Sequence, residues 1–535
     1  MLFALATQQL LMAYDSTAMN VALSDIVKDL GTTLTGVQSA ISLYALVMAA
    51  LMISGSKLGS RHGYVRVFMV GAAIYGTGAL VTALSPNLPV MLLGWSLLEG
   101  MGAALVFPAI LSIATARFDA ATRTKALALI GAMAGVGAAL GPIVGGVITR
   151  FLTWRVSFLM ETVVTLLVVL LMRRVVEQRG PRPGRAFDVL GAVLSALGFG
   201  LVVSATLAAG RYGVFAARDD VILFGRTVIV KGGVAPTVWL GVAGLCTLVA
   251  FGWWEHRRVV RGQEPLVRID VLRDRTTRVG SWCLAVQFLV TAGVLFLVPV
   301  FVQTTLDYDA LRSGLTLLPA TATLIVAAAA FSALVGARRA THKSIIVVGF
   351  LAIAGGAVQV ALMLEPGISG LDLAPGLVLA GLGLGACAML PDLVQSSARP
   401  DNVSDVAGLS RSVSYLGQSV GVALGGVVLL GVLLSSFAAG VRDSQVLTGQ
   451  QKSVVTRTVE SGLQAAAVSD AQAVAVLADK GIIGPAADEL VRINAAARVD
   501  GLRAAVLVMG VFALMGMALA VRLPRRPRLH SVPDL

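Results

Sequence analysis

The stretch Leu2–Leu23, LFALATQQLLMAYDSTAMNVAL, is long and apolar enough to cross a membrane as a helix, yet it carries an aspartate, Asp15, in its interior. Placing an ionisable side chain in the hydrocarbon core costs about 2.5–3.5 kcal/mol on insertion scales, and such residues are usually functional. We therefore expect Asp15 to take up and release a proton. The alternative is a structural carboxylate that only holds helices together by hydrogen-bonding polar neighbours. These neighbours are Tyr14, Ser16, Thr17 and Asn20.

The whole chain repeats this apolar pattern. Its 535 residues are 57% hydrophobic and only 13% charged, with a mean hydropathy of +0.85. Repeated apolar runs of about 20 residues predict a polytopic helical membrane protein, which is one membrane unit with loops and no separate soluble domain. By the length needed to cross a bilayer we count about fourteen spans. The expected spans are 2–24, 37–55, 66–85, 88–115, 124–148, 153–172, 188–209, 236–254, 279–302, 313–336, 344–364, 373–396, 406–436 and 502–522.

The net charge of +13 reflects membrane topology rather than a nucleic-acid partner, because the basic residues gather at the ends of spans. They follow the second, sixth, eighth and last spans, which places these ends on one side. That side is expected to be cytoplasmic, with both termini there, in the plasma membrane of a bacterial cell. The chain starts almost directly in hydrocarbon, so we expect the first span to be retained rather than cleaved as a signal. The three cysteines lie inside apolar runs and indicate neither a disulfide framework nor a metal site.

Two loops on the opposite, outer side are long. Residues 210–237 contain two strand-like runs, 221–224 and 227–230, and are expected to form a small hairpin. Residues 438–500 read as two polar amphipathic helices broken near Gly481–Pro485. This second loop is either a solvated cap or a docking surface for an external partner, and the sequence leaves both interpretations open.

Several motifs occur together along the chain. The first span holds DSTAMNVAL at Asp15–Leu23, and the fifth holds GAALGPIVGG at Gly137–Gly146. The sixth span begins with Trp154 and Arg155. Other matching positions are Phe158, Gln303, Leu306, Asp307, Tyr308, Leu311, Ser313, Gly314, Leu315, Leu318, Pro319, Gly408, Arg411, Gly417 and Gly421. Together these residues resemble the fourteen-span drug–proton antiporters, a branch of the major facilitator superfamily.

The resemblance implies an all-α major facilitator fold with two six-helix bundles plus two additional linking spans. The N-terminal bundle would comprise residues 1–172, and the C-terminal bundle would comprise residues 279–522 with the large outer helical loop 438–500. The remaining expected segments are a basic cytoplasmic linker at 173–187, the two extra spans at 188–254 with the outer loop 210–237, a second basic cytoplasmic linker at 255–278, and a cytoplasmic tail at 523–535.

The glycine-rich run in span five is the most specific of these motifs. The residues that match the family's antiporter motif are Gly137, Gly141, Pro142, Gly145 and Gly146. Four glycines and a proline leave a smooth and kinkable helix face on which a partner helix can pack and slide. Alternating access needs such a seam on the side that opens and closes. Simple helix packing is the alternative interpretation.

The sequence departs from the family pattern at two places. In the loop after span two, Ser56–Tyr64 reads SKLGSRHGY, with serines where the family has a glycine and an aspartate. The expected cytoplasmic gate loop keeps Arg61 and Gly63, but its charge relay is weakened or rebuilt. In span four, Ser96–Gly100 reads SLLEG, so the family's proton-relay arginine is absent and Glu99 stands next to its place.

The residues expected to couple transport to protons are Asp15, Glu99, Glu161 and Arg411. By a helical rise of about 1.5 Å per residue, Glu99 should lie near mid-depth and Glu161 about 12 Å below the outer surface. Since they are also on different helices, they are poorly placed to form a catalytic or sensing pair. Arg411 either supplies the basic partner that span four lacks or anchors at the interface by snorkelling. The side chains expected in a substrate cavity are Asn20, Gln287 and Tyr415.

The sequence shows no phosphate-binding glycine loop, no hydrolase triad spacing and no soluble catalytic domain, so we expect neither an enzyme nor a bound cofactor. Several buried acids with one or two bases suit a lipophilic cation that competes with protons. The prediction is a proton-coupled antiporter that exports lipophilic, cationic or amphiphilic drug-like compounds, with the proton gradient as energy source. Its partners would be this small substrate, protons and the lipid bilayer. The alternatives are an exporter or flippase of an endogenous lipid or cell-envelope precursor, and a non-transporting membrane sensor.

Overall fold

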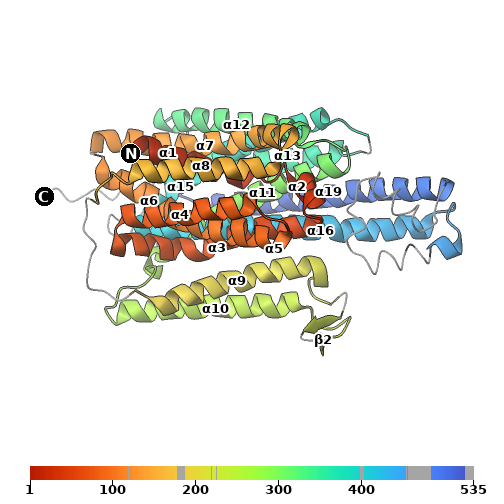
Figure 1. Ribbon diagram of the computed structural model, residues 1–535, viewed down its shortest axis with the longest axis horizontal. Helices are drawn as coiled ribbons and strands as arrows, with labels where there is room; N and C mark the ends of the chain where they lie inside the picture. The colour runs from red at the N-terminus through yellow and green to blue at the C-terminus, as the bar shows by residue number, and fades with distance from the viewer. Residues whose placement is uncertain are drawn as a thin grey trace.

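The computed structural model describes residues 1–118, 120–177, 187–217, 220–223, 226–365, 367–397, 403–452, 455 and 484–524. These residues form long helices that lie side by side in one elongated bundle (Figure 1). Thirteen of the described helical stretches are long and apolar enough to cross a membrane. The first helix, α1 (Leu2–Ala18), is shorter and packs on α7 (Ala120–Phe151). With α1 included, the number of spans agrees with the sequence-based count, and the all-α fold is confirmed.

The described helices follow the predicted spans in order. The N-terminal part of the chain contains, besides α1 and α7, the helices α2 (Leu23–Asp29), α3 (Leu34–His62), α4 (Tyr64–Ala83), α5 (Leu88–Met91), the π-helix η1 (Leu92–Glu99), α6 (Gly100–Arg117) and α8 (Trp154–Met172). The C-terminal part contains the 3-10 helix η2 (Ile269–Arg273), α11 (Arg275–Thr304), α12 (Ala310–Gly336), α13 (His342–Met363), the 3-10 helix η3 (Gly370–Leu373), α14 (Ala374–Cys387), α15 (Leu390–Ser396), α16 (Val403–Asp443) and α19 (Pro485–Ala520).

Polar residues determine where many of these helices begin. Thr33, Asp188, Asp274, Asp309 and Thr341 each accept a hydrogen bond from the backbone N–H three residues further on. Each of these bonds satisfies a donor that the first helical turn leaves open and contributes about 1 kcal/mol. The apolar runs that follow supply the buried faces, so local capping and burial specify the same helix starts.

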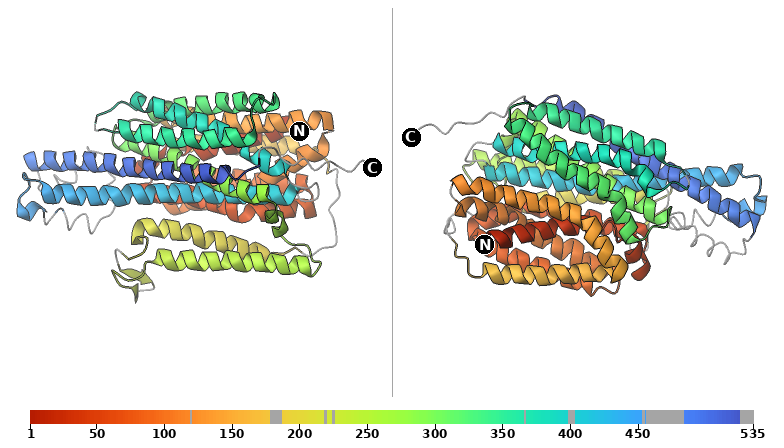
Figure 2. Two further views of the ribbon diagram at one scale, coloured as in Figure 1. Left: turned by 180° about the vertical axis from the view of Figure 1, so that it is seen from behind. Right: turned by 90° about the horizontal axis from the view of Figure 1, so that it is seen from above.

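Two helices near the C-terminal end are much longer than a membrane span. α16 has 41 residues and α19 has 36, whereas about 20 residues cross the hydrocarbon core. They run together beyond the rest of the bundle, at the end that also carries strand β2 (Figures 1 and 2). We call this the outer end, following the predicted topology. Beyond the bundle, the two helices pack through apolar side chains that include Phe437, Val441, Leu490 and Ile493.

The long outer loop predicted at 438–500 is partly built from these two helices. α16 continues to Asp443, and α19 begins at Pro485, close to the break predicted near Gly481–Pro485. The last span, predicted to start at residue 502, is therefore the final part of a helix that starts outside the membrane. Residues 456–483 of the predicted loop lie outside the described ranges.

Two further helices, α9 (Val189–Tyr212) and α10 (Pro236–Val260), lie as a pair at the side of the bundle (Figure 1), where α9 packs on α3 and α16 and α10 packs on α9. Between them, strands β1 (Val221–Leu223) and β2 (Arg226–Ile229) pair antiparallel, with Val221 opposite Ile229 and Leu223 opposite Arg226. The small hairpin predicted in the loop 210–237 is confirmed.

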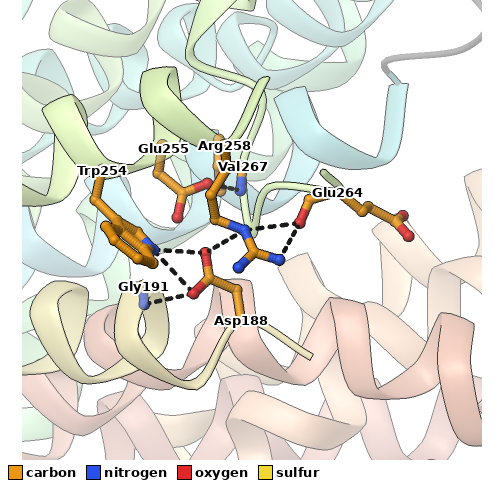
Figure 3. A network of polar contacts seen from close by, with 7 residues as sticks. All are labelled: Asp188, Gly191, Trp254, Glu255, Arg258, Glu264 and Val267. Atoms are coloured by element: carbon orange, nitrogen blue, oxygen red, sulfur yellow. Dashed lines mark hydrogen bonds and ion pairs between the residues drawn. The ribbon is translucent and has the colours of Figure 1, made fainter. Parts of the chain in front are cut away.

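A buried polar network joins α9 and α10 at the end opposite the β hairpin (Figure 3). The Asp188 carboxylate accepts hydrogen bonds from the Gly191 N–H (2.8 Å) and the Trp254 indole N–H (3.0 Å). It also forms an ion pair with Arg258 Nε at 3.2 Å. Arg258 in turn donates to the backbone carbonyl of Glu264 (3.0 Å), so the network also holds the segment that follows α10.

Replacing the central acid of this network is expected to destabilise the protein. Asp188→Ala removes a helix cap and leaves the Arg258 side chain, only 14% exposed, without its carboxylate. Breaking a buried ion pair in this way costs about 3 kcal/mol. Thermal denaturation in detergent should show a lower midpoint. The control is Asp270→Ala, which breaks an ion pair with Arg273 whose side chains are 42% and 78% exposed and should cost less than about 1 kcal/mol. Equal effects of the two substitutions would contradict this ranking.

Hydrogen bonds join the N-terminal and C-terminal halves of the bundle toward the outer end. The buried Gln303 of α11 donates to the carbonyl of Val21 (2.9 Å) and accepts from the N–H of Ser24 (3.0 Å). The buried Gln38 of α3 donates to the carbonyl of Ala423 in α16 (3.2 Å). These bonds between side chains of one half and backbone groups of the other hold the two halves together on this side.

Removing the amide of Gln303 is expected to loosen the outer contact. In Gln303→Leu the Val21 carbonyl and the Ser24 N–H lose their hydrogen-bond partner, at a cost of about 1–2 kcal/mol. This cost lowers the ratio of molecules closed at the outer end to molecules open there by about tenfold. The measurement is labelling of Ala423→Cys, a position fully buried between the halves, by a membrane-impermeant maleimide in a background without the native cysteines. Labelling should become about tenfold faster. An unchanged rate would show that these bonds do not hold the outer end closed.

Candidate functional site

Three acidic side chains from separate helices meet inside the N-terminal half. Asp15 comes from α1, Glu99 from the last position of η1 and Glu161 from α8, and their exposures are only 1%, 0% and 1%. One carboxyl oxygen of each lies within 4.8 Å of the others. In the described part of the chain, none of the three forms an ion pair with a basic side chain. Three buried acids in this arrangement require positive charge, either as protons or as a bound cation.

This meeting corrects one sequence-based expectation. We expected Glu99 and Glu161 to lie at different depths and to be poorly placed as a pair, but the structure puts their carboxyl oxygens within 4.8 Å of each other. The depth argument assumed straight helices perpendicular to the membrane. Glu99 is instead the last residue of a π-helical segment, where the wider turn shifts the register, and both side chains are long enough to meet between helices.

Close helix packing brings the three elements together. A Cβ at Gly78 of α4 would lie 2.6 Å from the Glu99 backbone nitrogen and 2.7 Å from the Gly94 carbonyl oxygen, so only glycine permits this contact. On the other side of the site, α7 packs on α1. There a side chain at Gly137 would overlap the Leu10 carbonyl, and one at Gly141 would overlap the Thr17 hydroxyl.

Two aromatic side chains donate hydrogen bonds to the acids. The Trp95 indole N–H donates to Asp15 Oδ1 at 2.8 Å, and the Tyr75 hydroxyl donates to Glu161 Oε2 at 2.9 Å. Asp15 Oδ2 and both oxygens of Glu99 are buried without such a partner among the described residues. Sequence analysis missed Trp95 and Tyr75. A signal for Trp95 was present, because it precedes Glu99 by four residues and therefore lies on a similar helix face.

Aromatic rings form one wall of the site. Trp95 stacks on Tyr44 with ring centroids 5.3 Å apart, and it meets the edge of Phe158 at 6.4 Å. A small cavity of about 10 Å³, room for about one water molecule, adjoins this wall. Its lining includes Asp15, Phe158 and Glu161. A water there would touch two of the three acids.

Arg411 lies outside this group of acids. Its guanidinium sits over the Phe107 ring, 4.5 Å from the ring centroid, which joins α16 of the C-terminal half to α6 of the N-terminal half. Tyr415, one turn further along α16, is partly buried and lies near enough to Asp15 and Arg411 to feel their charges. A role for Arg411 as the missing basic partner therefore remains a prediction.

The residues predicted to line a substrate cavity come from both halves of the bundle, and their shared role stays a prediction. Asn20 is buried at the end of α1 and donates to the Ser16 carbonyl at 3.3 Å. Gln287 is buried in α11 of the other half. Neither they nor Tyr415 line the small cavity beside Asp15.

The antiporter-motif glycines serve two interfaces. Gly137, Gly141 and Gly145 face α1 within the N-terminal half. Gly146 faces the other half, where an added Cβ would lie 2.7 Å from the Ala310 carbonyl oxygen of α12. The Pro142 carbonyl of α7 likewise faces Gly314 of α12, and a Cβ there would overlap it. The motif therefore lies at the seam between the halves as well as within one half.

The predicted gate loop is a tight turn between α3 and α4. Gly63 has φ +97°, a conformation that favours glycine, and Arg61 beside it is exposed. The Glu177 carboxylate, from the segment after α8, reaches this turn and accepts a hydrogen bond from the Val65 N–H at 2.9 Å. An acid thus stands at the loop although the loop itself lacks the family's aspartate. Nothing in the sequence could indicate it, since 112 positions separate the two residues.

A polytopic helical bundle in two halves, with a buried group of acids inside one half, is typical of a membrane transport protein. The family model described as Major Facilitator Superfamily matches residues 5–422, and the chain belongs to this family. The resemblance stated from the sequence motifs is confirmed.

Its relatives include proteins named for resistance and export. The puromycin resistance protein pur8 of Streptomyces alboniger is 30% identical over 440 residues, which is 80% of this chain and 81% of that protein. The tetracenomycin C resistance and export protein of Streptomyces glaucescens is 27% identical over 530 residues, 97% of this chain and 90% of that protein. A solved bacterial homologue of the human lysosomal transporter Spinster, inward-facing and unoccupied, gives a TM-score of 0.60 at 15% identity and covers 97% of this chain and 95% of its own. The similarity to this solved structure shows only that the two proteins share a fold.

Proposed function

We propose that the protein exports small lipophilic compounds, cationic or amphiphilic, in exchange for protons by alternating access. The names of its relatives support export of antibiotic-like substrates. The observation that carries the coupling to protons is the buried group formed by Asp15, Glu99 and Glu161. Three acids this close bind a proton or a cation far more readily than they stay fully ionised.

Competition between the proton and the substrate follows from this charge requirement. A cationic substrate that approaches Asp15 supplies the positive charge that the acids need, so a proton can leave. A proton that arrives later displaces the cation in the same way. The aromatic rings of Tyr44, Trp95 and Phe158 add π faces to which an organic cation is attracted. In this scheme Arg411 adjusts the charge balance from the C-terminal half.

The seam between the halves would provide the movement. In the structure, Gln38 and Gln303 hold the halves together toward the outer end, which suits a state that opens inward. The glycine face of α7 against α12 lets the halves separate there without breaking interlocked side chains. The gate loop with Arg61 and Gly63 would then close the opposite end. The same scheme places the protein in the plasma membrane with both termini cytoplasmic and the proton gradient as its energy source.

The experiment that tests this function is transport in everted membrane vesicles. A proton pump in the vesicle membrane acidifies the lumen, and ethidium or another lipophilic cation of a panel is added outside. Accumulation of the cation in the lumen is measured with and without a protonophore. Vesicles that lack the protein are the control. The proposal expects accumulation of at least one compound that collapses with the protonophore. If no compound accumulates, or if accumulation is the same with and without the protonophore, the proposal of proton-coupled export is wrong.

A further inference from the structure

The hydrogen-bond donors around the three acids are not shared equally. Asp15 receives the Trp95 N–H and Glu161 receives the Tyr75 O–H, at 2.8 and 2.9 Å. Both oxygens of Glu99 are buried without a hydrogen-bond donor at normal distance among the described residues, although the Tyr75 hydroxyl lies near Glu99 as well. A buried carboxyl group without a donor, next to carboxyl groups that have one, is stabilised when it carries the proton and donates it itself.

Four tyrosine side chains surround the three acids in the described part of the chain. The titratable side chains that face the acids from neighbouring helices are Tyr14 of α1, Tyr44 of α3, Tyr75 of α4 and Tyr415 of α16. Phenols are neutral at pH 7. Arg411 of α16, the base predicted to pair with these acids, has its guanidinium over the Phe107 ring. Protons can therefore supply the positive charge that the three acids require.

The small cavity also distinguishes Glu99 from the other two acids. Asp15 and Glu161 line it, and Glu99 does not. A water in the cavity can thus exchange protons with Asp15 or Glu161, while Glu99 is reached only through its neighbours. The same acid that lacks an outside donor is also the one shielded from the cavity.

The backbone holds Glu99 in this place. The π-helical turn η1 carries both Trp95 and Glu99, and π-helical turns of this kind occur mostly at functional sites. The backbone of α4 packs directly on it at Gly78 and leaves no room for a side chain between them. Trp95 is in turn fixed by its stacking on Tyr44.

From these observations we propose that Trp95 and Tyr75 are positioning residues that decide where the protons of the site reside. Trp95 stabilises the ionised form of Asp15. Asp15 takes up and releases its proton through the cavity. Glu99 keeps a proton and donates it to Glu161, whose other hydrogen bond comes from Tyr75. The inference rests on the proposed function for its meaning, because it names which acid exchanges the transported proton, but its test does not require transport.

The test is infrared spectroscopy of the purified full-length protein in detergent at neutral pH, in the carbonyl-stretching region of protonated carboxyl groups. We expect a band from a buried carboxyl group that exchanges slowly in heavy water. Glu99→Gln should remove it, and Asp15→Asn should leave it. The control Glu489→Gln should also leave it, because Glu489 is held as a carboxylate by Arg492, with Nε at 2.8 Å. Loss of the band in Asp15→Asn but not in Glu99→Gln would overturn the assignment.

A second variant tests the positioning role itself. Trp95→Phe keeps an aromatic ring on Tyr44 but removes the N–H that Asp15 accepts. A second carboxyl band should then appear, and it should vanish in the double variant Trp95→Phe/Asp15→Asn. A spectrum unchanged by Trp95→Phe would show that this donor does not hold Asp15 ionised. A wild-type protein that shows these bands but moves none of the lipophilic cations of the panel would contradict the proposed function and leave the proton assignment standing.

Discussion

Asp15→Asn is expected to abolish proton-driven accumulation of ethidium in everted vesicles. A proton that moves down a gradient of one pH unit releases about 1.4 kcal/mol, which supports about a tenfold substrate gradient per coupled proton. Asparagine cannot exchange a proton in this range, so the gradient should fall to the level set by passive equilibration. The measurement compares steady-state accumulation by wild type and variant at equal amounts of protein in the membrane.

This substitution separates the two interpretations of Asp15 that the sequence left open. The asparagine carbonyl can still accept the Trp95 N–H, so a purely structural role of Asp15 would survive. Asp270→Asn, which changes a half-exposed acid outside the membrane spans, is the matched control and should transport normally. Full proton-driven accumulation by Asp15→Asn would mean that Asp15 is structural and that Glu161 exchanges the proton instead.

Gly146→Val is expected to give the second largest loss, by forcing the two halves apart. The added Cβ would lie 2.7 Å from the Ala310 carbonyl oxygen and 3.0 Å from the Leu311 Cα, and backbone atoms cannot move aside as a flexible side chain can. Such overpacking costs about 3 kcal/mol, which shifts a two-state equilibrium about 150-fold away from the closed outer end. Ethidium efflux should fall at least about tenfold, since a complete cycle passes through that state.

The same helix offers a matched control. Gly131 of α7 has no heavy atom within 4 Å of an added Cβ, so Gly131→Val makes the same chemical change without a clash. It should leave efflux within about twofold of wild type, because surface substitutions usually change stability by no more than about 0.5 kcal/mol. Faster labelling of Ala423→Cys in the Gly146→Val background would confirm that the outer end has opened. Equal losses at both glycines would instead point to a general effect on α7.

The sequence could identify the acids of the site but not their arrangement. Each of Asp15, Glu99 and Glu161 interrupts an apolar span, and that alone marks it as a candidate, because an acid in hydrocarbon is costly. Their meeting depends on how three helices cross and on the π-helical turn that ends at Glu99, which no residue pattern specifies. Depth counted along straight helices therefore gave the wrong answer for Glu99 and Glu161.

Partners of the site residues were harder to predict than the residues themselves. Trp95 and Tyr75 are ordinary aromatic residues of apolar spans, and only the fold shows that their polar atoms reach carboxylates. Glu177 reaches the gate turn from a distant part of the chain. In contrast, the fold class was predictable, because helix length, hydropathy and capping residues are local properties that the bundle does not override.

The projecting pair formed by α16 and α19 has a practical consequence for imaging. At a rise of about 1.5 Å per residue, α16 is about 60 Å long, about twice the thickness of the hydrocarbon core. Membrane proteins whose two halves look alike are difficult to orient in electron micrographs, because the detergent micelle hides their features. A rigid rod on one face breaks that resemblance and gives each particle a visible direction. Antibody fragments raised against the paired helices around Phe437 and Leu490 would enlarge this landmark without touching the acids inside the bundle.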